Sequence, residues 1–271
     1  MQPAIFDMIF PRPTFAERMQ AVAEAGFTAF QLDFAAVGLD SMPTAIPDGT
    51  IAEIRQGASA AGLAIAGIGG TWNMIHPDPT LRAEGMASLR AIAAACAPLG
   101  TGIVTLSTGT RDAANMWRRH PDNDTPEAWD DLLASMREAL AIADEHDIVL
   151  AFEPEPANVA KNARTARTLL DTLAHPRLKI CFDAANIAAG DLSRDPLVVI
   201  REALDLLGPE VVIAHGKDID AEGEFCPAGT GVVPWPETVA ALGAAGFDGA
   251  MVLHSLGEAD VPLAKAVMGF A

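Results

Sequence analysis

Short apolar runs and amphipathic segments alternate along the whole chain. Runs typical of strands lie at residues 4–10, 27–34, 63–67, 102–107, 148–152, 178–182, 211–214 and 250–253. Segments with apolar residues at helical spacing lie at residues 15–25, 51–61, 81–97, 126–145, 163–173, 196–207, 236–245 and 261–270. Strands that alternate with helices form a parallel sheet covered by helices, because each return to the sheet needs a helix-length connection. Eight such repeats favour a closed (β/α)8 barrel.

The main alternative is an open, doubly wound sheet. Such a sheet usually has a glycine-rich phosphate loop after its first strand, but this chain continues there with the residues Pro11, Arg12 and Pro13. No linker or shift in composition divides the chain, and 271 residues is a common length for a barrel of one domain. The sequence therefore predicts an α/β protein with one (β/α)8 TIM barrel domain over residues 1–271.

Charge and composition exclude several classes of protein. The 36 acidic and 18 basic side chains give a net charge of −18, which repels a polyanion such as nucleic acid. No apolar stretch reaches the roughly 18 residues that a membrane span needs, and residues 1–10 do not resemble a secretory leader. The three cysteines, Cys96, Cys181 and Cys226, lack the CxxC spacing of a redox or zinc motif. We expect a cytoplasmic protein with no nucleic-acid or membrane partner.

Four polar residues end strand-type runs in the second half of the chain. Glu153, Asp183, His215 and His254 follow one another at intervals of 30, 32 and 39 residues. The carboxyl ends of the strands of a barrel meet at one face, which is where the active sites of such barrels lie. Carboxylate oxygens and imidazole nitrogens are common ligands of divalent metal ions. The pattern predicts one divalent metal ion held by these four residues.

Two residues at these strand ends have side chains suited to proton transfer. Glu153 can accept a proton from a carbon atom beside a carbonyl group. Lys217 follows His215 by two residues, which places both on the same side of the strand, and its ammonium group can stabilise an oxyanion. We expect Glu153 and Lys217 to be catalytic. The alternatives are a glutamate that only caps the next helix and a lysine that only forms an exposed ion pair.

Other polar or aromatic residues near the predicted strand ends are candidates for substrate contact. An aromatic wall suits a sugar ring, and an arginine suits a phosphate or carboxylate group. A packing role for the tryptophan and a surface turn for the arginine are equally good alternatives. The loop 219–234 is the best candidate for a lid. The substrate-binding candidates are Trp72, His76, Arg111, Glu155 and Asn186.

The order of these residues resembles the xylose-isomerase-like superfamily of sugar phosphate isomerases and epimerases. The resemblance rests on the glutamate and aspartate above, on the His-x-Lys-Asp sequence at 215–218, and on Gly-x-Gly at 229–231 with Trp-Pro-Glu at 235–237. It covers nearly the whole chain. It implies a TIM barrel that binds one divalent metal ion, often manganese, through Glu153, Asp183, His215 and a fourth ligand. It also implies proton transfer on a hydroxy-carbonyl substrate.

Two residues depart from the pattern of that family. Its epimerases and isomerases usually have a second glutamate where this chain has His254, and many have a histidine where this chain has Asn186. Epimerisation with two bases needs an acid or base on each face of the substrate carbon, so the second group is open, with Glu155 and Glu258 as candidates. An imidazole in place of a carboxylate favours zinc, iron or cobalt relative to magnesium. The metal, which is Mn, Zn, Co, Fe or Mg, is therefore not assigned.

The sequence predicts a metal-dependent isomerase or epimerase in carbohydrate metabolism. Its expected partner is a small sugar, a sugar phosphate or a related hydroxy-carbonyl compound. One alternative is a polyol or inosose-type dehydratase, which begins with the same removal of a proton. Another is a non-catalytic ligand-binding barrel, because a fold does not determine an activity. Apolar helix faces such as that of residues 81–97 leave a homodimer open.

Overall fold

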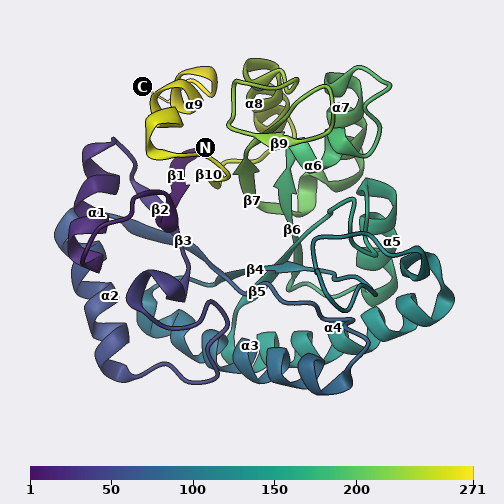
Figure 1. Cartoon of the computed structure of the whole chain (residues 1–271), viewed down its shortest axis with the longest axis horizontal. Helices are drawn as coiled ribbons and strands as arrows, with labels where there is room; N and C mark the ends of the chain where they lie inside the picture. The colour runs from purple at the N-terminus through teal and green to yellow at the C-terminus, as the bar shows by residue number, and fades with distance from the viewer. Residues whose placement is uncertain (271) are drawn as a thin grey trace.

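The computed structural model describes residues 1–270, which form a closed barrel of parallel strands (Figure 1). Each strand pairs in parallel with its two neighbours, and the pairing of the first with the last closes the barrel. The predicted (β/α)8 fold is confirmed. The barrel strands are β1 (Gln2–Phe6), β2 (Ala29–Leu32), β3 (Ala64–Gly69), β4 (Ile103–Ser107), β5 (Val149–Glu153), β6 (Leu178–Asp183), β7 (Val211–Gly216) and β10 (Ala250–Leu253).

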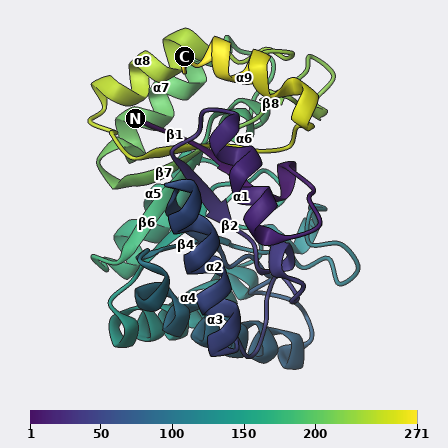
Figure 2. The same cartoon turned by 90° about the vertical axis from the view of Figure 1, so that its left-hand side faces the viewer.

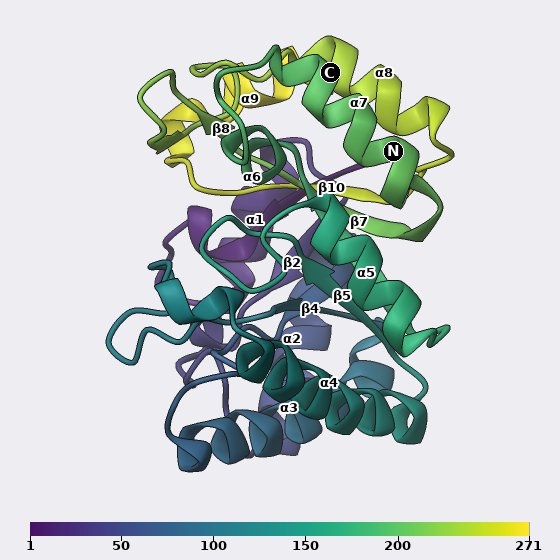
Figure 3. The same cartoon turned by 90° about the vertical axis from the view of Figure 1, so that its right-hand side faces the viewer.

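Helices surround the barrel on its outer side. Figure 2 shows α1 and α2 beside the first strands, and Figure 3 shows α5 and α7 on the other side. Local sequence explains several helix ends: Thr14 and Glu17 form a capping box before α1, and Gly100 ends α3 in the left-handed conformation. The helices are α1 (Phe15–Glu24), α2 (Asp48–Ala61), α3 (Pro79–Leu99), α4 (Pro126–His146), α5 (Ala163–Leu173), α6 (Ala184–Ala189), α7 (Pro196–Leu207), α8 (Trp235–Ala244) and α9 (Val261–Val267).

The interior of the barrel is built in layers. One layer contains small or apolar residues, among them Ala29, Ala151, Cys181 and Ile213. Side chains alternate between the two faces of a strand, so the residue two positions later faces the interior again. In these four strands that residue is Gln31, Glu153, Asp183 and His215. The barrel therefore has an apolar floor, with a polar layer above it at the carboxyl ends of the strands.

The structure differs from the predicted elements in several places. Residues 7–9, predicted as the end of the first strand, form a 3-10 turn in which the buried carboxylate of Asp7 accepts a hydrogen bond from the amide of Asp33. Helix α6 was not expected, because six residues are too few to show helical periodicity. The loop 219–234 contains part of a small hairpin of β8 (Asp218–Ile219) and β9 (Phe225–Cys226). The last helix ends at Val267 rather than at residue 270.

Gly85 lets helix α3 approach the loop after β3. A Cβ atom at this position would lie 2.0 Å from Cδ1 of Trp72, which is closer than any real Cβ contact. Trp72 is only 7% exposed, so its indole ring has little freedom to move away.

We predict that Gly85→Ala lowers the free energy of unfolding by about 1–3 kcal/mol, because overpacking forces side chains or backbone to shift. Urea unfolding at equilibrium measures the change. Gly243→Ala in α8 is the matched control, since a Cβ there would meet no atom of the described residues within 4 Å. The control should be within about 1 kcal/mol of the wild type. Equal stability of both variants would show that Trp72 does not pack tightly on α3.

Candidate functional site

A cavity of about 540 Å³ opens at the carboxyl ends of the barrel strands. Its wall combines a charged group of carboxylates, imidazoles and a lysine with aromatic and small polar side chains, as is typical of sites for small molecules. The lining residues used below are Gln31, Asp33, Thr105, Trp117, Glu153, Glu155, His215, Lys217, Phe225, His254 and Ser255.

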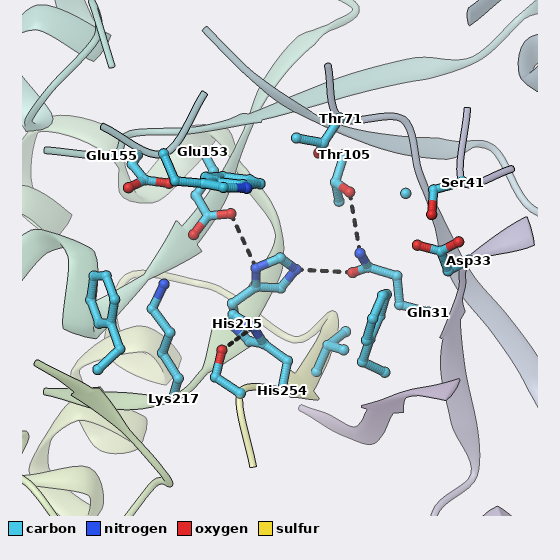
Figure 4. Close-up of a pocket in the computed structure, with 16 residues that line it drawn as sticks. Gln31, Asp33, Ser41, Thr71, Thr105, Glu153, Glu155, His215, Lys217 and His254 are labelled. Atoms are coloured by element: carbon cyan, nitrogen blue, oxygen red, sulfur yellow. Dashed lines mark hydrogen bonds and ion pairs between the residues drawn. The ribbon is translucent and has the colours of Figure 1, made fainter. Parts of the chain in front are cut away.

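His215 lies at the centre of the site. Figure 4 shows its imidazole between Glu153 and Gln31. Nε2 of His215 lies 2.9 Å from Oε1 of Gln31, and Nδ1 lies 3.3 Å from Oε2 of Glu153. The first contact is a hydrogen bond. The second does not have hydrogen-bond geometry, and Nδ1 is a buried atom with no hydrogen-bond partner among the described residues. The imidazole is thus held from one side and leaves a nitrogen free on the other.

Asp183 ends β6 and is completely buried. Its Oδ1 accepts a hydrogen bond from the amide of Asn186, while Oδ2 lies 3.1 Å from Nε2 of His254 and 3.4 Å from Nζ of Lys217. Burial alone would raise the pKa of this carboxyl group. The charge of Lys217 and the hydrogen bond with His254 outweigh burial and hold the pKa below its usual range. Asp183 is therefore a carboxylate at neutral pH.

Lys217 is buried beside three carboxylates. Burial lowers its pKa, but the charges of Asp183, Glu153 and Glu155 overcome that effect and raise the pKa above the usual value. Its Nζ also lies 3.9 Å from the ring centroid of Phe225 in the β8–β9 hairpin. The side chain is thus a fixed ammonium group in the wall of the cavity.

Glu153 is oriented by Asn186. The amide group of Asn186 donates a hydrogen bond of 2.6 Å to Oε1 of Glu153. Asn186 is 1% exposed and lies outside the cavity lining, because the turn of α6 directs it against the glutamate. In the structure Asn186 thus contacts Glu153, and its contact with substrate stays a prediction.

Glu155 lines the cavity and is mostly buried. Burial raises its pKa to about 7, and the negative charge of Glu153 adds to the effect. Glu258, the other candidate for a second acid, is exposed and pairs with Arg12 at 2.7 Å outside the cavity lining. Of the two, the structure brings only Glu155 to the cavity.

His254 follows β10 and lies between Asp183 and Ser255. Its Nδ1 is 3.0 Å from the hydroxyl oxygen of Ser255. Burial lowers the pKa of the imidazole, and the hydrogen bond with Asp183 only partly opposes this effect. His254 is accordingly a neutral imidazole at neutral pH.

The donor atoms of this cluster suit a divalent metal ion. They form two groups that share His215, one with Glu153 and Cys181 and the other with Asp183 and His254, and within each group the ligand atoms lie within 4.8 Å of one another. Bonds of about 2.1 Å place tetrahedral ligand atoms roughly 3.4 Å apart. The contacts of 3.1 Å between Asp183 and His254 and of 3.3 Å between Glu153 and His215 are close to that separation. The free Nδ1 of His215 is the expected condition of a ligand atom.

Cys181 is the least suitable donor in the cluster. It lies in the apolar floor of the barrel and is completely buried. Burial raises the pKa of its thiol well above the usual value, and the neighbouring carboxylates raise it further. The thiol therefore stays protonated, whereas metal ligation needs the thiolate.

Three of the expected substrate contacts lie away from the cavity lining. Trp72 packs against Gly85, so the packing alternative describes it. His76 accepts a hydrogen bond from the amide of Asp78 and contacts a backbone oxygen at 3.2 Å. Arg111 pairs with Asp131 at 2.8 Å and donates to two backbone oxygens, which ties together the surrounding loops. Each of these side chains is occupied by structural contacts.

The cavity also contains residues that the sequence pattern did not identify. Gln31 and Thr105 belong to the polar interior layer, and a polar residue inside an otherwise apolar strand was the available signal. Trp117 and Phe225 are 57% and 45% exposed and line the cavity from two different loops. Their position depends on how those loops fold, which no periodicity reveals.

No helix formed by residues 1–270 is long and apolar enough to cross a membrane. A comparison with curated protein sequences gives no significant match.

Comparisons with solved structures show the same fold. The apo form of 3-keto-D-glucoside 4-epimerase YcjR from E. coli matches with a TM-score of 0.76 and 16% identity, over 100% of this chain and 98% of that chain. D-psicose 3-epimerase with D-tagatose from Clostridium cellulolyticum H10 matches with a TM-score of 0.71 and 17% identity, over 97% and 89%. The probable 3-DHS dehydratase AsbF from Bacillus anthracis matches with a TM-score of 0.75 and 16% identity, over 99% and 98%.

The sequence itself carries the family assignment. A family model described as xylose isomerase-like TIM barrel matches residues 19–267, which is most of the chain. This match agrees with the resemblance found in the strand-end residues. The chain belongs to the xylose isomerase-like TIM barrel family.

Proposed function

We propose that this protein is a metal-dependent epimerase or isomerase that moves a proton beside the carbonyl group of a small, unphosphorylated sugar. The observation that carries the proposal is the cluster of Glu153, Asp183, His215, His254 and Lys217 at the base of one cavity. Two of the similar structures described above are a 3-keto-D-glucoside 4-epimerase and a D-psicose 3-epimerase with D-tagatose, which supports the same class of substrate.

The residues that would hold the metal are Glu153, Asp183, His215 and His254. A divalent ion bound there supplies positive charge that stabilises the negative charge developing on the oxygen atoms of the substrate. Two oxygen and two nitrogen donors are compatible with Mn, Zn, Co, Fe or Mg, so the donor set does not select one metal.

Glu153 is the proposed base. Asn186 holds one of its oxygen atoms at 2.6 Å, which fixes the orientation of the carboxylate while its side chain still reaches the cavity. Proton removal next to a carbonyl group is efficient when the base is held in such a fixed position. Glu155 lines the same cavity and is the second carboxyl group that a reaction with two bases needs.

Lys217 is the proposed group that stabilises the substrate oxygen. Its ammonium group lies in the cavity wall, and burial leaves it little conformational freedom. A fixed donor in a partly dehydrated site stabilises developing charge better than a mobile one, because it needs no reorganisation during the reaction.

The aromatic residues at the cavity support a sugar as substrate. A sugar has hydroxyl groups at its edge and apolar C–H groups on its faces. Trp117 and Phe225 offer apolar surfaces near the charged cluster. The loop that holds Trp117 is well ordered by its own contacts: Arg118 pairs with Asp112, and the amide of Trp117 donates to the side chain of Asn115. An exposed tryptophan on such a fixed loop is typical of a binding surface.

The loop after β7 argues against a phosphate group on the substrate. Many TIM barrels bind phosphate with backbone amides of the loops after the seventh and eighth strands. Here the buried carboxylate of Asp218 accepts hydrogen bonds from the amides of Ile219, Gly229 and Val233 and from Nε1 of Trp235. These donors are already used inside the protein.

The charge of the cavity supports the same conclusion. Asp33, Glu153 and Glu155 line it, and Lys217 is its one lysine or arginine among the residues that the structure describes. The ammonium group of Lys217 is already compensated by Asp183 at 3.4 Å. Because carboxylates compensate both Lys217 and the proposed metal ion, the lining offers a phosphate dianion no uncompensated positive charge.

We predict that Glu153→Gln slows the exchange of substrate hydrogen with solvent deuterium by a factor of about 100 or more, because an amide cannot act as the base. NMR of a ketohexose incubated in D2O with the metal-loaded enzyme measures the exchange. Glu258→Gln, the same chemical change at an exposed glutamate, should keep the wild-type rate. Retained exchange in Glu153→Gln contradicts the assignment of the base. Exchange that leads to loss of water rather than to an epimer would indicate a dehydratase.

We also predict that kcat/KM for free ketohexoses exceeds that for their phosphate esters by at least about 100-fold, which corresponds to roughly 2.8 kcal/mol. The physical reason is the acidic cavity and the amide donors already occupied by Asp218. Steady-state kinetics on matched pairs of a sugar and its phosphate tests this prediction. A preference for the phosphate ester would show that the substrate carries an anion.

A further inference from the structure

A chain of buried polar groups crosses the interior of the barrel. Gln31 on β2, Thr105 on β4 and His215 on β7 are 5%, 3% and 7% exposed. Figure 4 shows them as one hydrogen-bonded series from Thr105 through Gln31 to His215. Burying polar groups costs free energy unless they are hydrogen-bonded, and the layer beneath is apolar. A buried polar series above an apolar layer therefore indicates a functional role rather than a contribution to stability.

The backbone oxygen of Ile68, which lies next to Thr105, determines the direction of every hydrogen bond in the series. The hydroxyl of Thr105 lies 3.5 Å from the backbone oxygen of Ile68, which can only accept, so the hydroxyl donates there. Its oxygen therefore accepts from Nε2 of Gln31 at 3.2 Å. The carbonyl oxygen of the Gln31 amide then faces His215, and it accepts from Nε2 of the imidazole at 2.9 Å. The proton of a neutral His215 consequently lies on Nε2.

This direction determines what the other nitrogen of His215 can do. A neutral imidazole carries one N–H, so Nδ1 carries a lone pair. Nδ1 is buried, has no hydrogen-bond partner among residues 1–270 and lies 3.3 Å from an oxygen of Glu153. Two lone-pair atoms that face each other at this distance need a cation between them to be favourable.

His254 is held by other partners. Its Nε2 lies 3.1 Å from Oδ2 of Asp183, a carboxylate that can only accept, so a neutral His254 carries its proton on Nε2. Its Nδ1 then accepts from the hydroxyl of Ser255 at 3.0 Å. Neither contact involves Gln31 or Thr105, so His254 serves as an internal reference for His215.

We propose that Gln31 and Thr105 are positioning residues that hold His215 in the tautomer with its proton on Nε2, so that Nδ1 is always available to a cation beside Glu153. Partners of this kind that fix the tautomer of a ligating histidine typically change metal affinity by 10–100-fold when they are removed. The inference rests on the proposed function for the presence of a metal ion, whereas the tautomer itself exists in the metal-free protein.

The test is long-range 1H–15N correlation NMR of metal-free protein, which distinguishes the two neutral tautomers and the imidazolium. The wild type should show His215 with its proton on Nε2. Gln31→Leu removes the acceptor and should shift His215 to a mixture of tautomers, whereas Gln31→Glu keeps an acceptor and should keep a proton on Nε2. His254 should be unchanged in both variants. Thr105→Val, which removes only the hydroxyl, is the second variant if Gln31→Leu does not fold, and it should also produce a mixture.

Calorimetric titration with zinc ions completes the experiment. Zinc should bind Gln31→Leu about 10–100-fold more weakly than the wild type. A wild-type His215 with its proton on Nδ1, or an imidazolium, overturns the inference, and so does a Gln31→Leu variant with an unchanged tautomer and unchanged zinc affinity. If the tautomer responds as expected but zinc does not bind the wild type, the positioning role stands and the proposed metal dependence fails.

Discussion

The buried carboxylate of Asp183 is the interaction on which the site depends. A fully buried charge is stable only when other groups compensate it, and removal of one partner of such a pair typically costs about 3–5 kcal/mol. Asp183 meets its partners in three segments: the amide of Asn186 in the first turn of α6, Lys217 after β7 and His254 after β10. These contacts hold the strand ends in register with one another, so the geometry of the cavity floor follows from the need to satisfy one charge.

A second buried aspartate, Asp218, organises the loop after β7. Its carboxylate accepts hydrogen bonds from three backbone amides of that loop and from the indole of Trp235. The same interaction places the β8–β9 hairpin, and with it Phe225 beside Lys217. The loop is therefore organised by an internal anion. The loop thus contributes Phe225 to the cavity, while its amide donors bind Asp218 instead of an anionic substrate.

Most of the fold and the centre of the site could be predicted from the sequence, because both depend on the regular alternation of strands and helices. The carboxyl ends of parallel strands meet at one face, so strand-end positions alone placed Glu153, Asp183 and His215 together. The same logic did not reveal that Trp72 and Arg111 lie outside the cavity lining, since whether a residue after a strand enters the cavity or packs outward depends on the approach of helices and loops. Gly85 in the following helix α3 leaves the space in which Trp72 packs. The contact of Asn186 with Glu153 arises from α6, a helix too short for its pattern to be seen.

The central claim is that Glu153, Asp183, His215 and His254 hold one divalent metal ion. Elemental analysis of protein purified without chelator or affinity metal tests it most directly, for the wild type, Asp183→Asn and His254→Ala. The account predicts nearly one metal ion per chain in the wild type and a clear loss in both variants. A wild-type protein that contains no metal, even after incubation with manganese, zinc or cobalt, would contradict it. In that case Asn186, Lys217 and His254 satisfy Asp183 without a metal ion, and the cluster is a structural feature of a ligand-binding barrel.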